Sequence, residues 1–126
     1  MSEYYCGLFS LMVKSWRQAW DDKLPFITVQ LTPHAFAVAP RIWPNLIHQQ
    51  IKATRTIDDV YMVTTSELGT YGNVHSLPKF PIGERMFITA QSQVYGKGGE
   101  YCGPIFKKAE KDGNRLRLYF DHAESG

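Results

Sequence analysis

The sequence has few of the residues that build metal centres and disulfide frameworks. It contains two cysteines, Cys6 and Cys102, which lie far apart and form no Cys-x-x-Cys pair. No histidine stands beside either one at the spacing of a zinc site, so we expect no metal. A buried free thiol is the simpler interpretation of each, and a disulfide between them is the alternative. The sequence also shows no phosphate-binding loop and no nucleophile elbow, and we expect no cofactor.

Long apolar segments and a strong charge of one sign are missing as well. No stretch approaches the ~18 apolar residues of a membrane span, and the first residues lack the basic and apolar segments of a secretory signal. We therefore expect no membrane partner and no export of the chain as given, although its compartment stays open. The formal net charge of +2 is spread evenly, which gives no reason to expect nucleic acid.

What the sequence does contain is typical of a folded globular protein. Of its 126 residues, 44% are hydrophobic and 21% are charged, which argues against a disordered chain or a coiled coil. This length is that of one domain or of part of one.

Helical and extended patterns alternate through the first half of the chain. Apolar residues recur at three- and four-residue steps from residue 4 to residue 20, which predicts an amphipathic helix with Trp16 and Trp20 in the core. The apolar run 26–31 is typical of a strand buried in a parallel sheet. After a loop at 32–40, Pro44 opens a second helix, and residues 58–65 predict a second strand.

The pattern changes in the second half. A polar loop at residues 66–81 precedes a third predicted helix at 82–94, which ends at a group of glycines. Segments 105–108 and 115–120 flank an Asp-Gly pair, which is a good signal of a β-hairpin. We expect any domain boundary near residues 96–103, where the α/β pattern gives way to antiparallel strands.

One segment has the character of an active site. His75 lies in the polar loop that follows the second predicted strand. Parallel sheets carry their functional groups in loops beyond the carboxyl ends of the strands, where a histidine can act as a general base. Because two strands are few for an open sheet, the pattern indicates part of a larger α/β fold.

Short motifs along nearly the whole chain occur in an order and spacing shared with a known family. They are Trp16-Arg17-x-x-Trp20, Leu24-Pro25-Phe26-x-x-Val29-Gln30-Leu31, Trp43-x-x-Leu46-x-x-x-Gln50, Leu68-Gly69, Val74-His75-x-x-x-Lys79-x-x-Ile82-Gly83-x-Arg85, Tyr95-Gly96 and Gly103-Pro104-x-Phe106. By these motifs together the chain resembles the sialate O-acetylesterase family of SGNH-type hydrolases. The resemblance covers the C-terminal half of the catalytic domain and the start of the β-rich region that follows it.

The resemblance implies a fold and a chemistry. The fold is an α/β fold, the C-terminal half of a three-layer α/β/α domain at residues 1–98, with the start of a β-rich segment at residues 99–126. The chemistry is hydrolysis of acetyl esters on sialic acid or related sugars by a serine nucleophile. His75 falls on the family's histidine and is expected to be the general base, because a neutral imidazole can take the serine proton. Members of the family are often exported or lysosomal.

The chain departs from the family at two members of the catalytic triad. The family's Gly-Gln-Ser-Asn and Gln-Gly-Glu blocks have no counterpart, so we expect the nucleophile outside this chain. Gly72 stands where many members have an aspartate, three residues before the histidine. Glu67 then either orients the imidazole of His75 or is a solvated or capping residue. Besides an acetylated sugar, the expected partner is a missing N-terminal half or a second copy of the chain.

The other three histidines have plainer settings. His34, in the loop after the first predicted strand, either lines the cleft or is structural, and His48 is expected to be structural. His122 is expected in a solvated tail beside Asp121.

Two functions of different classes remain. The chain is either part of a sialate O-acetylesterase-like hydrolase or a non-catalytic remnant that keeps the half-fold for packing or carbohydrate binding. The two functions are distinguished by whether a nucleophile is supplied from outside this chain, by a preceding segment or by a partner chain.

Overall fold

The computed structural model describes residues 2–32, 42–69, 72–73, 75 and 77–124. The chain divides into two compact units, residues 1–87 and 88–126. The first unit has mixed helices and strands, and the second contains a long hairpin. The predicted division of a larger domain at residues 98 and 99 stays a prediction.

The first unit opens with a short 3₁₀ turn, η1 (Ser2–Tyr4), and the helix α1 (Tyr5–Trp20). The predicted amphipathic helix is confirmed, with Cys6 and Val13 buried on its inner face. The helix ends at Asp21, which adopts a left-handed conformation with φ of 50°. The prediction that Trp16 and Trp20 belong to the core was wrong, since they are 48% and 63% exposed.

The Trp16 ring is nevertheless in contact with other aromatic rings. It lies 5.9 Å from the ring of Phe26 and 5.7 Å from that of Trp20, measured between centroids. The helix period predicts which residues share a face, but not whether another element covers that face.

The two strands of the first unit run parallel. β1 (Phe26–Val29) pairs with β2 (Val60–Val63), with Phe26 opposite Val60 and Val29 opposite Val63. The helix α2 (Ile42–Thr56) connects them, with Pro44 in its first turn as predicted. Both strands are shorter than predicted. Beyond β1, the Leu31 backbone N–H donates to the Gln50 side chain at 3.0 Å rather than to a strand.

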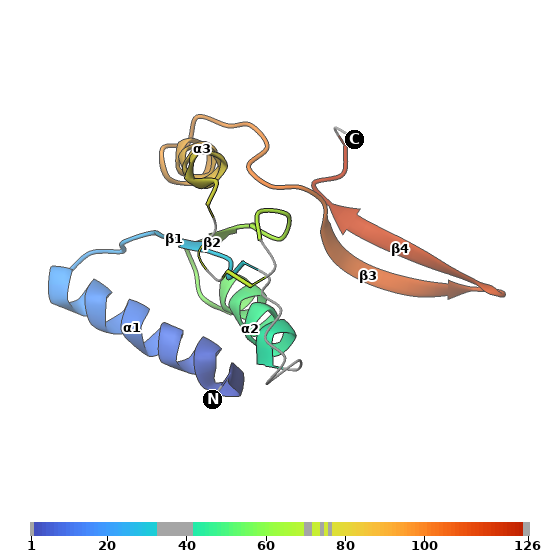
Figure 1. Cartoon of the computed structure of the whole chain (residues 1–126), viewed down its shortest axis with the longest axis horizontal. Coiled ribbons are helices and arrows are strands. Elements are labelled where there is room, and N and C mark those ends of the chain that lie inside the picture. The colour runs from blue at the N-terminus through green and yellow to red at the C-terminus, as the bar shows by residue number, and fades with distance from the viewer. Residues whose placement is uncertain (1, 33–41, 70–71, 74, 76, 125–126) are drawn as a thin grey trace. The chain divides into compact units, whose positions relative to one another are not determined.

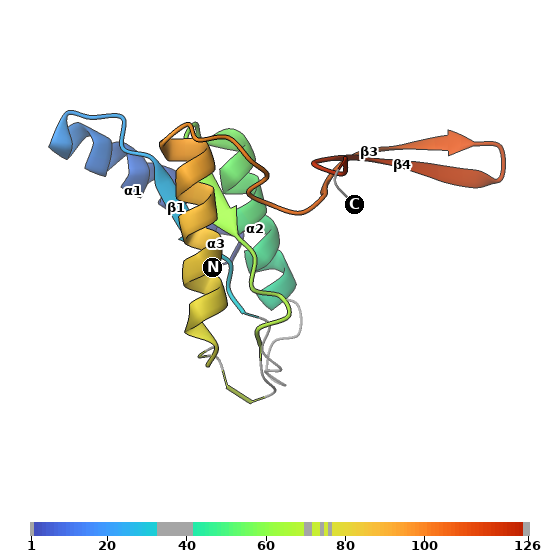
Figure 2. The ribbon, with the colours of Figure 1, turned by 90° about the horizontal axis from the view of Figure 1, so that it is seen from above.

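Helices cover both faces of this strand pair. α1 and α2 pack together on one face, and α3 (Lys79–Thr89) lies on the other (Figure 1). Figure 2 shows the same order from above, with α3 in front of the strands and α1 and α2 behind them. The layers are therefore helix, sheet and helix, and the predicted α/β class is confirmed.

The third helix differs from its prediction at both ends. It begins at Lys79, three residues before the expected start, because Pro81 falls in its first turn, where a proline is tolerated. At the other end the α-helix changes into a π-helical turn, η2 (Ala90–Val94), closed by a hydrogen bond from Tyr95 N to Ala90 O at 2.9 Å.

The second unit carries the predicted hairpin, which is confirmed. β3 (Ile105–Asp112) pairs antiparallel with β4 (Arg115–Asp121), with Asp112 opposite Arg115. The connecting loop is Gly113-Asn114, and Gly113 has a φ of +62°. A positive φ at the first position of a two-residue loop is characteristic of a type II′ turn, which favours glycine there.

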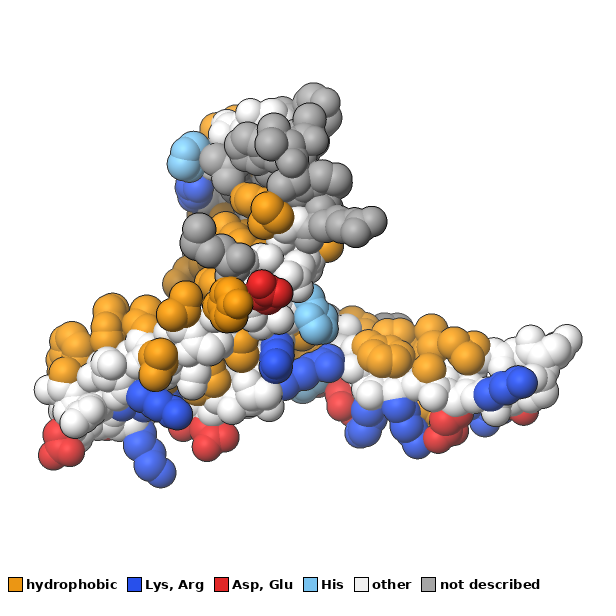
Figure 3. Space-filling model, turned by 90° about the horizontal axis from the view of Figure 1, so that it is seen from below, with side chains coloured by type: hydrophobic (Ala, Val, Ile, Leu, Met, Phe, Trp, Pro, Cys, Tyr) orange, Lys and Arg blue, Asp and Glu red, His pale blue; other side chains and the backbone are white. Residues whose placement is uncertain are grey.

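The hairpin has one apolar and one charged face, which the space-filling view of Figure 3 shows along opposite sides of the hairpin. On the charged side, ion pairs join Lys107 to Asp121 and Arg117 to Asp112 at 2.7 and 2.9 Å. The large apolar side chains of the strands are exposed, and they are Phe106, Leu116, Leu118 and Phe120. None of the helices formed by the described residues has the length and apolarity that a membrane crossing requires.

Candidate functional site

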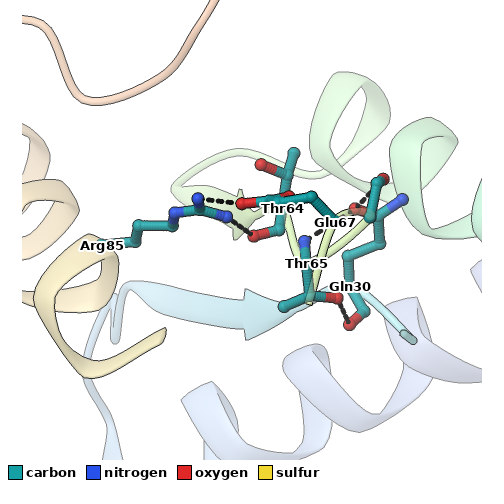
Figure 4. Close-up of polar contacts among 6 residues, drawn as sticks. Gln30, Thr64, Thr65, Glu67 and Arg85 are labelled. Carbon is teal, nitrogen blue, oxygen red and sulfur yellow. Dashed lines mark hydrogen bonds and ion pairs between the residues drawn. The ribbon is translucent and has the colours of Figure 1, made fainter. Parts of the chain in front are cut away.

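The carboxyl ends of β1 and β2 meet at one edge of the sheet, and two buried polar residues lie there. Gln30 follows β1, and Thr65 follows β2 by two residues. The Thr65 backbone N–H donates to Gln30 Oε1 at 3.1 Å, and Thr65 Oγ1 donates to the Gln30 carbonyl at 2.8 Å (Figure 4). Ser66 Oγ donates to the same Oε1 at 3.2 Å. These bonds tie the loop after β2 to the end of β1.

A second glutamine supports the same edge from α2. Gln50 is 3% exposed, and its side chain bridges the backbone on both sides of Gln30. Its Oε1 accepts from Leu31 N at 3.0 Å, and its Nε2 donates to the Val29 carbonyl at 3.2 Å. The chain is thereby held where it leaves the sheet.

Arg85 connects α3 to the loop that follows β2. Its guanidinium donates to the Thr64 carbonyl and forms an ion pair with the Glu67 carboxylate (Figure 4). The hydrogen bond from Arg85 holds the pKa of Glu67 below its ordinary value. Glu67 is therefore an anion that braces the start of the loop against α3.

His75, the predicted general base, is exposed in this loop. Its backbone N–H donates to Asn73 Oδ1 at 2.9 Å, which makes a local side-chain turn. Gly72, the residue in place of the family's aspartate, has a φ of +81°. Residues 70, 71, 74 and 76 lie outside the described part of the chain. An exposed imidazole on a loop is accessible to a reacting group.

The Glu67 carboxylate is bonded to a partner other than His75. Within the described part of the chain, no hydrogen bond or ion pair joins them, and the carboxylate of Glu67 is bonded to Arg85. The alternative role expected for Glu67, orienting the imidazole, has no contact to support it. The sequence motif contained Arg85 but gave no sign of this pairing.

The remaining histidines differ in their exposure and partners, where the structure describes them. His48 is exposed on α2, and His34 lies outside the described residues. In the second unit, His122 Nδ1 pairs with Glu100 at 2.7 Å, and the imidazole lies edge-on to the Tyr101 ring. His122 is therefore held by its neighbours rather than simply solvated, which its sequence position did not reveal.

The described residues show no side chain bonded to the His75 imidazole and no metal-binding group. No serine hydroxyl among them is hydrogen-bonded to an imidazole, and no group of three or more His, Cys, Asp or Glu side chains is placed to hold a metal ion. Cys6 and Cys102 are free thiols, and burial raises the pKa of Cys102. The edge of the sheet thus presents a buried amide and a braced loop, and the loop carries the exposed His75.

Comparison with known proteins gives a likeness to a solved structure. No protein-family model matches the chain, and no curated protein sequence does. Among solved structures, the chain is similar to a carbohydrate acetylesterase from Xanthomonas citri, with 28% identity and a TM-score of 0.86. The match covers 96% of this chain and 29% of the acetylesterase, so the chain spans less than a third of that protein's length. The likeness supports a carbohydrate-esterase fold for this chain.

Proposed function

We propose that this chain is part of an acetylesterase that removes O-acetyl groups from sialic acid or a related sugar, with His75 as its general base. The observation that carries the proposal is the placement of His75. It lies in the loop after β2, at the carboxyl end of a parallel strand pair, in a chain whose fold matches a carbohydrate acetylesterase. The order of the motifs around His75 supports the same role.

The proposed reaction uses a serine that this chain does not supply. His75 takes the proton from the serine hydroxyl as its oxygen attacks the acetyl carbonyl. The imidazolium then gives this proton to the sugar oxygen, which leaves as a hydroxyl while the acetyl group stays on the serine. In the second half, His75 takes a proton from water as the water oxygen attacks the acetyl carbonyl. The imidazolium then returns this proton to the serine oxygen as the acyl bond breaks, which releases acetate and restores the serine hydroxyl.

The open edges of the sheet support a second polypeptide segment as part of the working enzyme. Within the described residues, β1 and β2 pair with each other alone, and parallel sheets are normally buried on both faces and contain more strands. We propose that such a segment completes the sheet and carries the serine. A second copy of this chain is the alternative partner, and the two are distinguished by mass in sedimentation.

A hybrid enzyme tests the function directly. We would replace the matching 29% of the Xanthomonas acetylesterase by this chain and measure hydrolysis of 4-nitrophenyl acetate and of 9-O-acetyl-N-acetylneuraminic acid. We expect an active hybrid whose kcat falls by about 10⁴-fold or more in His75→Ala, as for removal of a triad histidine. His48→Ala is the matched control and should retain the activity, because His48 is exposed on α2.

A folded hybrid with equal rates before and after His75→Ala would contradict the assignment of the base. The isolated chain supplies the complementary measurement. It should hydrolyse 4-nitrophenyl acetate no faster than its own His75→Ala variant, since the serine lies elsewhere. A clear histidine-dependent rate would place a nucleophile within the chain.

A further inference from the structure

Two buried glutamines at the same edge of the sheet differ in how fully their amides are used. Gln50 is 3% exposed and has a partner for both its oxygen and its nitrogen. Gln30 is 6% exposed, and its oxygen accepts two hydrogen bonds, from Thr65 N and Ser66 Oγ. Among the described residues, none accepts a hydrogen bond from Gln30 Nε2.

The orientation of the Gln30 amide follows from its partners. A backbone N–H can only donate, so the atom that faces Thr65 N must be the amide oxygen. The NH₂ group is therefore directed away from the end of β2, as the position of its nitrogen in Figure 4 shows. A buried amide donor without a partner costs about 1–3 kcal/mol, so an acceptor for this donor is expected in the working protein.

We propose that Gln30 Nε2 is a ligand-binding donor that takes an oxygen of the acetylated sugar. The inference rests on the proposed function and adds ligand binding to the structural role of Gln30. Gln30 lies just beyond the last residue of β1, where ligands of open α/β sheets bind. Two hydrogen bonds already hold its amide, so the donor needs no reordering when an oxygen arrives.

The sugar is favoured over a protein carbonyl as the acceptor. A strand added beside β1 would use its carbonyls in the backbone ladder, whereas Nε2 belongs to a side chain beyond the end of that strand. O-acetylated sugars present many hydroxyl, ether and carbonyl oxygens, which are the acceptors that an amide NH₂ binds.

A single substitution separates the two functions of the Gln30 side chain. Gln30→Glu keeps an oxygen to accept from Thr65 and Ser66, but it replaces the NH₂ donor by a second acceptor. It therefore preserves the contact that ties the loop and removes the contact with a ligand. Gln18→Glu makes the same chemical change on the exposed side of α1 and is the matched control.

The experiment follows the side-chain NH₂ signals of the ¹⁵N-labelled chain by NMR during titration with 9-O-acetyl-N-acetylneuraminic acid. We expect a saturable shift of the Gln30 NH₂ pair, and a dissociation constant about tenfold or more weaker in Gln30→Glu, as for loss of a buried hydrogen bond. Gln18→Glu should bind within about twofold of the unchanged chain. The signals of the unchanged chain carry the test if Gln30→Glu does not fold.

Each other outcome overturns the proposal in a different way. If residues of the loop after β2 respond to the sugar while the Gln30 NH₂ pair does not, the assignment of the donor is wrong and the proposed function stands. If the Gln30 signals move with protein concentration alone, the acceptor is a polypeptide. If a folded chain shows no response to the sugar at any residue, the proposed sugar site and the role of Gln30 both fail.

Discussion

The contacts that stabilise each of the two units differ in how far apart in sequence their residues lie. In the α/β unit, the polar contacts join residues far apart in sequence, such as Arg17 with the Asp58 carbonyl at 2.8 Å and Gln30 with Thr65. In the hairpin, ion pairs join the two neighbouring strands, such as Lys107 with Asp121 and Arg117 with Asp112. The first unit therefore depends on tertiary packing, while the second depends on its turn and on the pairing of neighbouring segments.

Burial follows the same division. Every buried hydrophobic residue of the described chain lies in the first unit, and these residues are Cys6, Val13, Ala53, Val60 and Val63. The hairpin leaves its large apolar side chains exposed and its charges in solvent. Exposed ion pairs contribute little free energy, so the hairpin is expected to be the less stable of the two units.

The largest effect is expected from Gln50→Leu, which should lower the stability of the α/β unit. The change removes the partners of the Leu31 N–H and the Val29 carbonyl, and both backbone groups lie beside buried residues. The free energy of unfolding should fall by about 2–4 kcal/mol. Urea unfolding followed by tryptophan fluorescence measures it.

Amide signals of residues 105–121 should stay unchanged in Gln50→Leu, because the hairpin makes its own contacts. A loss under about 0.5 kcal/mol would mean that the Gln50 bridge is not a main support of the sheet edge.

A smaller effect, confined to the other unit, is expected from Gly113→Ala. Gly113 has a φ of +62° and no atom near an added Cβ, so backbone strain of about 1–2 kcal/mol is the whole cost. Cross-strand contacts between Lys111 and Leu116 in NMR spectra should weaken. Unfolding of the α/β unit should keep the same midpoint; a shift of that midpoint would show that the two units are coupled.

The next prediction concerns pH and the brace between α3 and the loop. The folded pKa of Glu67 is lowered by Arg85, so the brace is fully present above the ordinary value of 4.5 and is lost as pH falls through the lowered pKa. Amide protection at residues 66–69 should decrease on acidification from about pH 6 to about pH 3.

Glu67→Gln should remove most of this pH dependence. The matched control is Glu110→Gln, which removes another carboxylate of lowered pKa but lies in the hairpin. An equal change at residues 66–69 in both variants would exclude the brace as the cause.

The smallest effect is expected from Arg117→Ala in the charged face of the hairpin. The Arg117 side chain is 63% exposed, and its ion pair with Asp112 should contribute less than about 0.5 kcal/mol. Cross-strand NMR contacts in low and high salt check this. A clear loss of hairpin structure in Arg117→Ala would mean that the Arg117–Asp112 ion pair stabilises the hairpin.

The sequence predicted the elements that have local causes. The apolar period from residue 4 to residue 20 predicted α1, and the Asp-Gly pair predicted a hairpin whose two loop residues are Gly113 and Asn114. It did not predict that Trp16 and Trp20 are exposed, because exposure depends on which elements cover a helix face. Nor did it predict the start of α3 at Lys79, since a proline near a helix end permits more than one boundary.

The candidate site was predicted in part. The place of His75, in the loop after a parallel strand, follows from the order of elements and agrees with the structure. Glu67 was left between two roles by sequence alone, and its contact with Arg85 on α3 shows a brace. The different partners of the Gln30 and Gln50 amide nitrogens have no sequence signal, because they depend on which distant groups pack against each side chain.

By itself, then, the sequence determined the α/β class, the hairpin and the candidate base, because helix period, strand composition and turn residues act over a few neighbouring positions. Only the tertiary structure decided which polar groups meet at the edge of the sheet. The partners of Gln30 and Arg85 lie 35 and 18 residues away, at Thr65 and Glu67, and a hydrogen bond requires that packing bring such atoms within about 3 Å.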